Sequence, residues 1–348
     1  MRLATRLLIA GVALLTGATA AGCSAQPGLA YAQGVKKPPA SAPASSAVPS
    51  SSAVASSSSA VPPSSPAAVA MVPPSQLPKT GPAPSILTVG APHGVKAKEG
   101  MLVDVSTGQV LWAKDPTTPR PIASITKVMT ALLIISAGHL NRKITVPRAV
   151  TAYVAKYDAN AAGLIPGQVF TVDELLHAML IMSACDAAYT LANAYGPGLP
   201  AFIAKMNAEA AKLGLAGTHF TSPDGLPYPT ETSTFSTPAD LITLGELAMR
   251  YPEFRSIVGL RFYSLKKGDG HSAYWFSTSN ELLGNYPGVV GIKTGFTDAA
   301  GHTLLFEAVR NGRTLMGVVL GSPPSGPASG AQDATKILNW GFALKQTS

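Results

Sequence analysis

The densest run of apolar residues in the chain predicts a helix that is buried on all sides. Between Val128 and Ile135 nearly every position is apolar. At helical spacing this pattern leaves no polar face, so we expect a buried helix within residues 121–138, ended by Gly138. The remaining elements are expected to pack around this helix.

A largely helical block is expected from residue 144 to about residue 214. Thr171 and Glu174 form the signature of a capping box in front of a long apolar run. A further helix is expected over residues 199–213. Another begins after Thr237, which is followed by a proline and by an acidic residue in the first turn.

Alternating and short apolar runs at both ends of this block predict strands. Asn311-Gly312 lies between the last two apolar runs and is the strongest short signal for a hairpin turn. A final helix is expected from about residue 330 to residue 342. Strands on both sides of a helical block predict an α/β (α+β) domain, with an antiparallel sheet covered by helices, an all-helical lobe and a ligand cleft between them. The predicted strands are residues 101–105, 109–113, 289–295, 302–309 and 314–320.

Ser124 and Lys127 lie at the start of the predicted buried helix. They are three residues apart and therefore neighbours on one helix face. A lysine that is carried into a buried helix loses its hydration, which favours the neutral amine. Because a neutral amine can take the proton of an adjacent hydroxyl, the two residues are a candidate nucleophile and base.

Composition divides the 348 residues into three parts. Residues 1–23 are an apolar leader, residues 24–92 consist mostly of Ser, Ala, Pro and Val, and residues 93–348 have the composition of a globular domain. The middle segment carries too little apolar surface to offset its ordering entropy, so we expect a disordered tether. The third part is the predicted catalytic domain.

The leader has the layout of a secretory signal peptide. Two arginines precede an apolar run over residues 7–15, which is too short to span a bilayer, and small residues lead to Cys23. The segment resembles a bacterial lipoprotein signal, in which this cysteine is acylated. Ordinary cleavage near Ala20 and an uncleaved anchor are the alternatives. Each of them places the protein outside the cytoplasm, tethered to the membrane of a bacterial envelope or secreted.

Cysteine usage and charge exclude several classes of function. Cys23 lies in a segment that is either lipidated or removed, so Cys185 is expected to carry a free thiol. The 26 Lys and Arg against 18 Asp and Glu give a formal net charge of +8 without any basic block. This charge suits an anionic envelope, and no basic-aromatic motif for nucleic acid is present. The histidines lack the spacing of metal ligands, so we expect no metal and no cofactor.

Two later segments support the interpretation of Ser124 and Lys127 as a catalytic pair. An S-x-x-K motif alone is weak, because Ser264 and Lys267 form a second match. Roughly sixty residues after Ser124, however, Ser183 follows an apolar helix. About 110 residues further on, Lys293-Thr-Gly ends a predicted strand.

The order, spacing and context of these segments resemble the serine D-alanyl-D-alanine carboxypeptidases, the low-molecular-mass penicillin-binding proteins. The resemblance covers about residues 98–341. It implies the fold of the DD-peptidases and β-lactamases. The segments that carry it are Pro-Ile-Ala-Ser-Ile-Thr-Lys-Val-Met-Thr at 121–130, Ala-Met-Leu-Ile-Met-Ser at 178–183 with Asp-Ala-Ala at 186–188, Met-Asn at 206–207, Pro-Asp-Gly-Leu at 223–226, Ser-Thr at 236–237 with Asp-Leu at 240–241, and Tyr-Pro-Gly-Val-Val-Gly-Ile-Lys-Thr-Gly at 286–295.

This resemblance assigns a role to each site residue. It implies that the backbone N–H groups of Ser124 and Phe296 form an oxyanion hole. A fixed cation at position 293 would also disfavour protonation of the base. The implied roles are nucleophile for Ser124, general base for Lys127, proton relay to the leaving amine for Ser183, binding of the substrate's terminal carboxylate for Lys293 and Thr294, and close approach of the substrate to the strand for Gly295.

Cys185 is where the sequence departs from the family pattern, which most often has Asn there. An amide donates to and accepts from a substrate amide, whereas a thiol does both weakly. Some family members carry Cys at this position, so activity is compatible with it. Two interpretations stay open for Cys185, a direct contact with the substrate and a small buried apolar residue.

The resemblance predicts a hydrolase of peptidoglycan biosynthesis and cell shape. The predicted reaction removes the terminal D-Ala from stem pentapeptides through an acyl-enzyme, and β-lactam antibiotics would be inhibitors. A D,D-transpeptidase would use the same acyl-enzyme with an amine acceptor. A serine β-lactamase is disfavoured because no E-x-x-L-N loop precedes the Lys-Thr-Gly strand. A non-catalytic wall-binding domain on a stalk is the alternative from another class.

Overall fold

The computed structural model describes residues 90–323 and 329–345. The predicted signal segment, residues 1–23, lies outside the described residues, as do residues 24–89 of the predicted tether.

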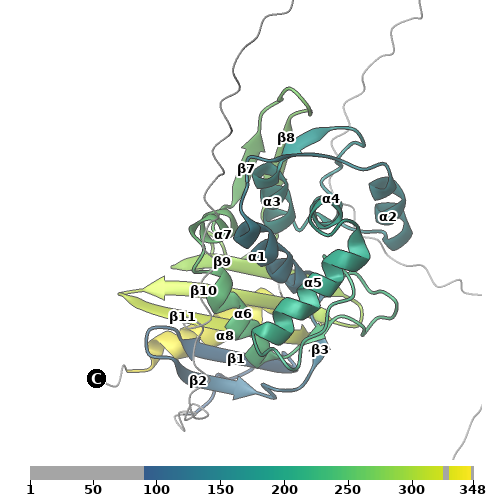
Figure 1. Cartoon of the computed structure of the whole chain (residues 1–348). Helices are drawn as coiled ribbons and strands as arrows, with labels where there is room; N and C mark the ends of the chain where they lie inside the picture. Colours follow the sequence, from purple (N-terminus) through teal and green to yellow (C-terminus); the bar gives the residue numbers. More distant parts are fainter. Residues whose placement is uncertain (1–89, 324–328, 346–348) are drawn as a thin grey trace, which may run out of the picture. The chain divides into compact units, whose positions relative to one another are not determined.

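An antiparallel sheet of five strands forms one half of the globular part (Figure 1). The spatial order is β2-β1-β11-β10-β9, so the first strands of the domain pair with the last ones. Both hairpins predicted from the apolar pattern are present, and Asn311 and Gly312 have the positive φ angles, 50° and 76°, of a tight hairpin turn. The strands are β1 (Glu99–Asp104), β2 (Gln109–Lys114), β9 (Val289–Thr297), β10 (Gly301–Arg310) and β11 (Arg313–Ser322).

The two faces of the sheet pack against different helices. Alternate side chains of a strand point to opposite faces. Leu304 and Phe306 of β10 therefore join one cluster with α8 (Ser329–Ala343), while Leu305 between them joins the other. The second cluster continues through α6 (Pro238–Ala248) into α1 (Lys127–Ala137). The sheet is thus a layer between α8 and the rest of the domain (Figure 1).

Helices form the other half, which lies on the side of the edge strand β9 (Figure 1). The buried helix predicted from the sequence is α1: of its 11 residues, eight are buried, and Gly138 follows at φ 74°. The predicted capping box of Thr171 and Glu174 is present. The other helices here are α2 (Ala149–Tyr157), α3 (Val172–Ile181), α4 (Cys185–Tyr195), α5 (Leu199–Lys212) and α7 (Pro252–Val258).

The structure contains two short strand pairs that were not predicted. The predicted helical block contains a small pair of strands, β4 (Lys143–Thr145) and β5 (Val169–Thr171). A hairpin of β7 (Phe262–Leu265) and β8 (Tyr274–Ser277), which the sequence analysis did not predict, stands outside the main sheet. Strands of three or four residues carry too few positions for a periodic pattern to be visible.

The start of the buried helix also differs from the prediction. Ser124 lies on a 3₁₀ turn, Ala123–Thr126, and the α-helix begins only at Lys127. The N–H of Lys127 donates to the carbonyl of Ser124, which is the bond of the tighter turn. Residues three apart eclipse each other in a 3₁₀ turn, so the predicted proximity of the two side chains is retained.

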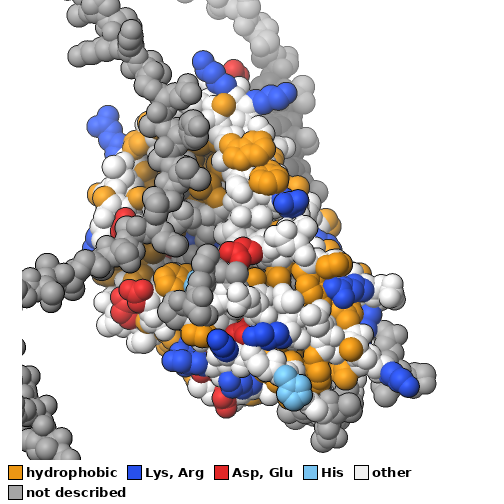
Figure 2. All heavy atoms as spheres, turned by 180° about the vertical axis from the view of Figure 1, so that it is seen from behind, with side chains coloured by type: hydrophobic (Ala, Val, Ile, Leu, Met, Phe, Trp, Pro, Cys, Tyr) orange, Lys and Arg blue, Asp and Glu red, His pale blue; other side chains and the backbone are white. Residues whose placement is uncertain are grey.

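The surface agrees with the even distribution of charge along the sequence. Figure 2 shows Lys and Arg side chains from the top of one face to its lower edge, among apolar and uncharged ones. Within residues 90–323 and 329–345, none of the helices has both the length and the apolar character that crossing a membrane requires.

Candidate active site

Ser124 and Lys127 meet at the junction of the 3₁₀ turn and α1. The Lys127 Nζ lies 2.9 Å from the Ser124 Oγ. The lysine side chain is fully buried. Its Nζ also donates to the carbonyl oxygen of Asp224 at 2.9 Å and lies 3.4 Å from the Cys185 Sγ. These three partners occupy the three positions around the nitrogen that are not bonded to carbon.

The loop that covers Lys127 is held by a glycine and a buried carboxylate. Gly225 has φ 84°, and a Cβ atom there would lie 1.8 Å from the carbonyl oxygen of Ala123. The fully buried Asp224 accepts a hydrogen bond from the Tyr153 hydroxyl at 2.8 Å. Burial and this carboxylate raise the pKa of Tyr153, which keeps the phenol protonated as a donor. The loop therefore presents the Asp224 carbonyl to Lys127 in a fixed position.

Ser183 and Cys185 come from the connection between α3 and α4. Ser183 has a positive φ of 67°, a left-handed conformation that costs a residue other than glycine some strain. Cys185 is the first residue of α4, and its N–H donates to the carbonyl of Asn160. Its free thiol is buried. Burial raises the pKa of Cys185 to about 12 despite the nearby Lys127 charge, so the thiol is neutral at pH 7.

The strand β9 supplies the opposite wall. A Cβ atom at Gly295 would lie 2.8 Å from the backbone N of Ser124, so only glycine allows the strand to approach the 3₁₀ turn this closely. Thr294 forms a hydrogen bond of 2.6 Å with the hydroxyl of Ser279. The ring of Phe296 is half exposed and packs against His302, with ring centroids 4.7 Å apart. Burial lowers the pKa of His302, so this imidazole is neutral at pH 7.

Lys293 is buried beneath this wall, 1% exposed, and donates to the carbonyl of Thr294 at 2.9 Å. Burial lowers its pKa well below the usual 10.5, and the charge of Lys127 adds to the effect. Between the lowered pKa and 10.5 the unfolded chain binds more protons than the folded one. The unfolding free energy therefore rises with pH over this window.

Replacing this lysine is expected to stabilise the fold. Lys293→Met removes the cost of burying an amine, so the free energy of unfolding at pH 7 should rise by roughly 1–3 kcal/mol. The gain should shrink as the pH approaches 10.5, where the unfolded amine also loses its proton. Urea denaturation of both proteins at pH 7 and pH 10 measures this. A variant that is less stable than the wild type at pH 7 would contradict the expectation.

The three walls enclose a cleft of about 670 Å³. All the residues predicted from the sequence to form the site meet here, although the two lysines are buried behind the surface of the cleft. The alternative motif does not contribute: Ser264 lies on β7, where residues three apart point to opposite faces, and Lys267 is exposed. The predicted residues that line the cleft are Ser124, Ser183, Cys185, Thr294, Gly295 and Phe296.

Three contacts at the site were not predicted. Ser279 bonds to Thr294, Asn160 holds the start of α4, and the Asp224 carbonyl binds Lys127. Asp224, in the segment Pro-Asp-Gly-Leu, was expected to be structural, and no contact with Lys127 was predicted for its carbonyl. A backbone carbonyl and a hydroxyl that follows a short hairpin leave no signal in a single sequence.

Comparisons with known proteins agree with this geometry. The family model described as D-alanyl-D-alanine carboxypeptidase, Peptidase_S11, matches residues 86–324. The chain belongs to this family. A D-alanyl-D-alanine carboxypeptidase of Streptomyces sp. (strain K15) is 38% identical over 262 residues, which cover 72% of this chain and 88% of that protein. One from Mycobacterium tuberculosis is 35% identical over 258 residues, covering 74% and 86%.

Solved structures give the same result. The crystal structure of the Streptomyces K15 DD-transpeptidase matches with a TM-score of 0.68 and 38% identity, and the match covers 74% of this chain and all of that one. A D-alanyl-D-alanine carboxypeptidase from Mycobacterium tuberculosis matches with a TM-score of 0.66 and 33% identity, covering 74% and 97%. The fold class, the family and the enzyme class predicted from the sequence, a serine-type D-Ala-D-Ala carboxypeptidase, are confirmed.

Proposed function

We propose that this carboxypeptidase removes the terminal D-Ala of peptidoglycan stem pentapeptides through an acyl-enzyme on Ser124. The observation that carries the proposal is the 2.9 Å contact between the Ser124 Oγ and the buried Lys127 Nζ. An unprotonated amine has two donors and one lone pair. With one N–H on the Asp224 carbonyl, the lone pair can accept the proton of the serine hydroxyl.

In the acylation step the Ser124 oxygen attacks the carbonyl carbon of the penultimate D-Ala, and its proton moves to Lys127. The carbonyl oxygen takes the negative charge, and the N–H groups of Ser124 and Phe296 stabilise it. The close approach of β9 at Gly295 supports this arrangement, because it brings the two N–H donors to one side of the cleft. β-Lactam antibiotics would acylate the same oxygen.

In the leaving-group step the C–N bond breaks and the terminal D-Ala departs as an amine. Ser183 lines the cleft and would pass a proton to that nitrogen. Lys293 and the hydroxyl pair of Thr294 and Ser279 would bind the carboxylate of the departing residue. A carboxylate brought next to Lys293 favours its charged form, so the substrate itself would recharge this lysine.

A substitution of Gly295 on β9 is expected to slow acylation without unfolding the protein. In Gly295→Ala the added methyl would lie 2.8 Å from the Ser124 backbone N, so β9 has to move away from the 3₁₀ turn. Misplaced oxyanion donors cost about 10²–10³-fold in rate. Stopped-flow acylation by a fluorescent penicillin measures the loss. Gly259→Ala is the control for a generic glycine effect, because its φ is −81° and an added Cβ would meet no atom closer than 3.4 Å.

A D,D-transpeptidase activity is the second candidate. The observation that favours it is the 38% identity to the structure named Streptomyces K15 DD-transpeptidase. Transfer would use the same acyl-enzyme, with an amine in place of water. The ratio of hydrolysis to transfer would depend on how the side of the cleft at Cys185 binds the acyl peptide.

A single assay tests both candidates. The described domain is incubated with a pentapeptide ending in D-Ala-D-Ala, with and without glycine as the amine acceptor, and free D-Ala and peptide products are quantified. The proposal predicts D-Ala release with a tetrapeptide acid as the main product. A glycine adduct as the main product would make transfer the principal reaction. Absence of D-Ala release by the wild-type protein would contradict both.

We also propose that the enzyme acts outside the cytoplasm, held to the membrane by lipid on Cys23 and a tether over residues 24–92. The layout of the leader supports this proposal. Metabolic labelling with a fatty acid, compared between the wild type and Cys23→Ser, tests it. Equal labelling of the two would contradict the lipid anchor and leave cleavage near Ala20 or an uncleaved anchor.

A further inference from the structure

A second hollow of about 440 Å³ lies beside the catalytic cleft. Its walls come from α2, α4, the start of α5 and the loop that covers Lys127. Nearly all its lining is apolar or aromatic. We call it the tyrosine groove after Tyr153, Tyr157, Tyr189 and Tyr228, which line it.

The tyrosine rings support one another, so the groove is formed before any ligand arrives. The centroid of the Tyr153 ring lies 4.6 Å from that of Tyr189 and 5.3 Å from that of Tyr157. Tyr157 in turn contacts Tyr228 edge to face at 6.4 Å. The Tyr228 ring is 50% exposed, so part of its surface is open to a ligand.

The rim of the groove is polar and positively charged. The Lys156 Nζ lies 4.9 Å from the ring centroid of Tyr157 and 5.2 Å from that of Tyr228. No carboxylate within the described residues forms an ion pair with it. The groove therefore combines ring faces with an ammonium that has no carboxylate partner and with phenol hydroxyls other than that of Tyr153, which donates to Asp224. Such donors suit an oxygen-rich ligand.

The groove continues the catalytic cleft. Tyr157 lines both hollows, and Pro227 lines the cleft while its neighbour Tyr228 lines the groove. If the terminal carboxylate lies at Thr294 and the oxyanion at Phe296, the rest of the stem peptide runs on past Phe296. Asp298 and Pro227 also line the cleft, and the loop of Pro227 leads directly to Tyr228.

We propose that the tyrosine groove binds the N-acetylated sugars of the glycan strand from which the stem peptide grows, a role that rests on the proposed function. A pyranose ring offers a face of C–H groups to an aromatic ring and a rim of hydroxyl and acetamido groups to polar side chains. The four residues between the scissile bond and the sugar reach about 13–14 Å when extended. This lets a stem in the cleft place its sugar beyond Pro227, over the groove.

The test compares two substrates with the same peptide. A free pentapeptide and a disaccharide-pentapeptide are assayed for D-Ala release by the wild type and two groove variants, Tyr228→Ala and Ala152→Trp. The first removes the exposed ring, and the second fills the groove from an exposed position without deleting a contact. Phe262→Ala is the matched control, since that ring is 48% exposed on a hairpin away from the groove.

The wild type should have the higher kcat/KM on the disaccharide-pentapeptide, and both groove variants should lose about tenfold on this substrate alone, equivalent to about 1.4 kcal/mol. Equal use of both substrates by the wild type would overturn the proposal, as would variants that leave the preference unchanged. Sedimentation with peptide-free glycan strands tests sugar binding by the groove separately from the proposed carboxypeptidase function. Binding that Tyr228→Ala abolishes supports the groove even if no D-Ala is released, and binding that survives in both variants contradicts it.

Discussion

Replacing Lys127 by methionine should slow acylation by a penicillin about 10³-fold while the protein stays folded. Methionine fills nearly the same volume but has no lone pair that accepts a proton, so Ser124 keeps its place and loses its base. Among the described residues, the Lys127 Nζ is the group that forms a hydrogen bond with the Ser124 Oγ. Stopped-flow fluorescence with a labelled penicillin gives the rate, and near-UV circular dichroism checks the fold.

The second S-x-x-K motif of the chain offers a matched control for this result. Lys267→Met removes an exposed lysine at the same spacing from Ser264 and should acylate at the wild-type rate. Acylation of Lys127→Met within threefold of the wild type would show that another group is the base. The sequence motif would then be right about the nucleophile and wrong about its partner.

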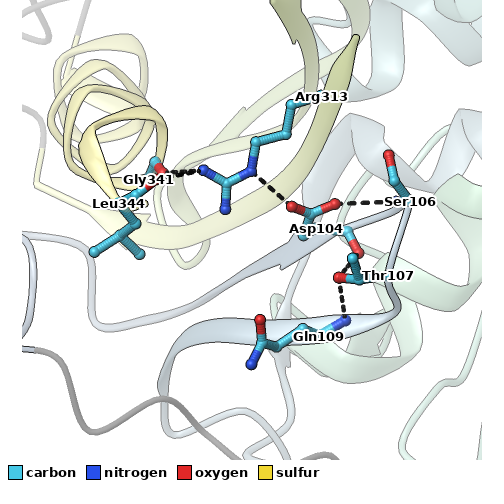
Figure 3. Close-up of polar contacts among 7 residues, drawn as sticks. All are labelled: Asp104, Ser106, Thr107, Gln109, Arg313, Gly341 and Leu344. Atoms are coloured by element: carbon cyan, nitrogen blue, oxygen red, sulfur yellow. Dashed lines mark hydrogen bonds and ion pairs between the residues drawn. The ribbon is translucent and has the colours of Figure 1, made fainter. Parts of the chain in front are cut away.

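Replacing Arg313 by leucine should cost about 3–5 kcal/mol of unfolding free energy, because it leaves a buried carboxylate unpaired. Figure 3 shows the contacts: the Arg313 Nε donates to Asp104 at 2.6 Å, and its Nη1 donates to the carbonyls of Gly341 and Leu344 at 2.8 and 3.1 Å. One side chain thus joins β1, β11 and the last turn of α8. Urea denaturation of the described domain measures the loss.

Two further variants separate the ion pair from a generic substitution effect. Arg148→Leu, at an exposed position, should change stability by less than about 0.5 kcal/mol. The double variant Asp104→Leu/Arg313→Leu should recover part of the loss, since no charge is left buried. It should not recover all of it, because Asp104 also accepts from the N–H of Ser106 (Figure 3). A double variant that is less stable than Arg313→Leu alone would contradict this account of the pair.

The elements that could be predicted from the sequence are those that local chemistry determines. The capping box at Thr171, the positive φ angles of Asn311 and Gly312 and the nearly continuous apolar run of α1 each depend on a few neighbouring residues. The antiparallel sheet with its helical cover followed from the order of these signals. Each of these features is determined by residues within a single turn or hairpin, so a pattern in one sequence is sufficient to predict it.

The features that were missed depend on residues far apart in the chain. The buried helix begins with a 3₁₀ turn whose Ala123 has a positive φ, and Gly225, about a hundred residues later, packs against it. The left-handed conformation of Ser183 and the contact between Ser279 and Thr294 also arise only when the chain is folded. No periodicity in the sequence predicts these long-range contacts and backbone conformations.

The structure brings the predicted site residues together around one cleft, while their roles stay a prediction and their geometry could not be predicted. Two interpretations of Cys185 were open, and the structure gives the thiol features of both: it is buried, it lines the cleft, and its sulfur lies 3.4 Å from Lys127. The contact between Cys185 and Lys127 was not predicted, because the Asn that is usual at position 185 was considered only as a partner of the substrate. A neutral thiol is only a weak donor and a weak acceptor toward a substrate amide, so the effect of Cys185 on hydrolysis and transfer stays a prediction.

Peptide mapping by mass spectrometry after brief exposure to benzylpenicillin tests the central claim most directly. The account predicts one penicilloyl group per molecule, attached to the peptide that contains Ser124, and no adduct in Ser124→Ala at the same drug concentration. A wild-type protein that remains unmodified, or an adduct that persists in Ser124→Ala, would contradict the assignment of the nucleophile.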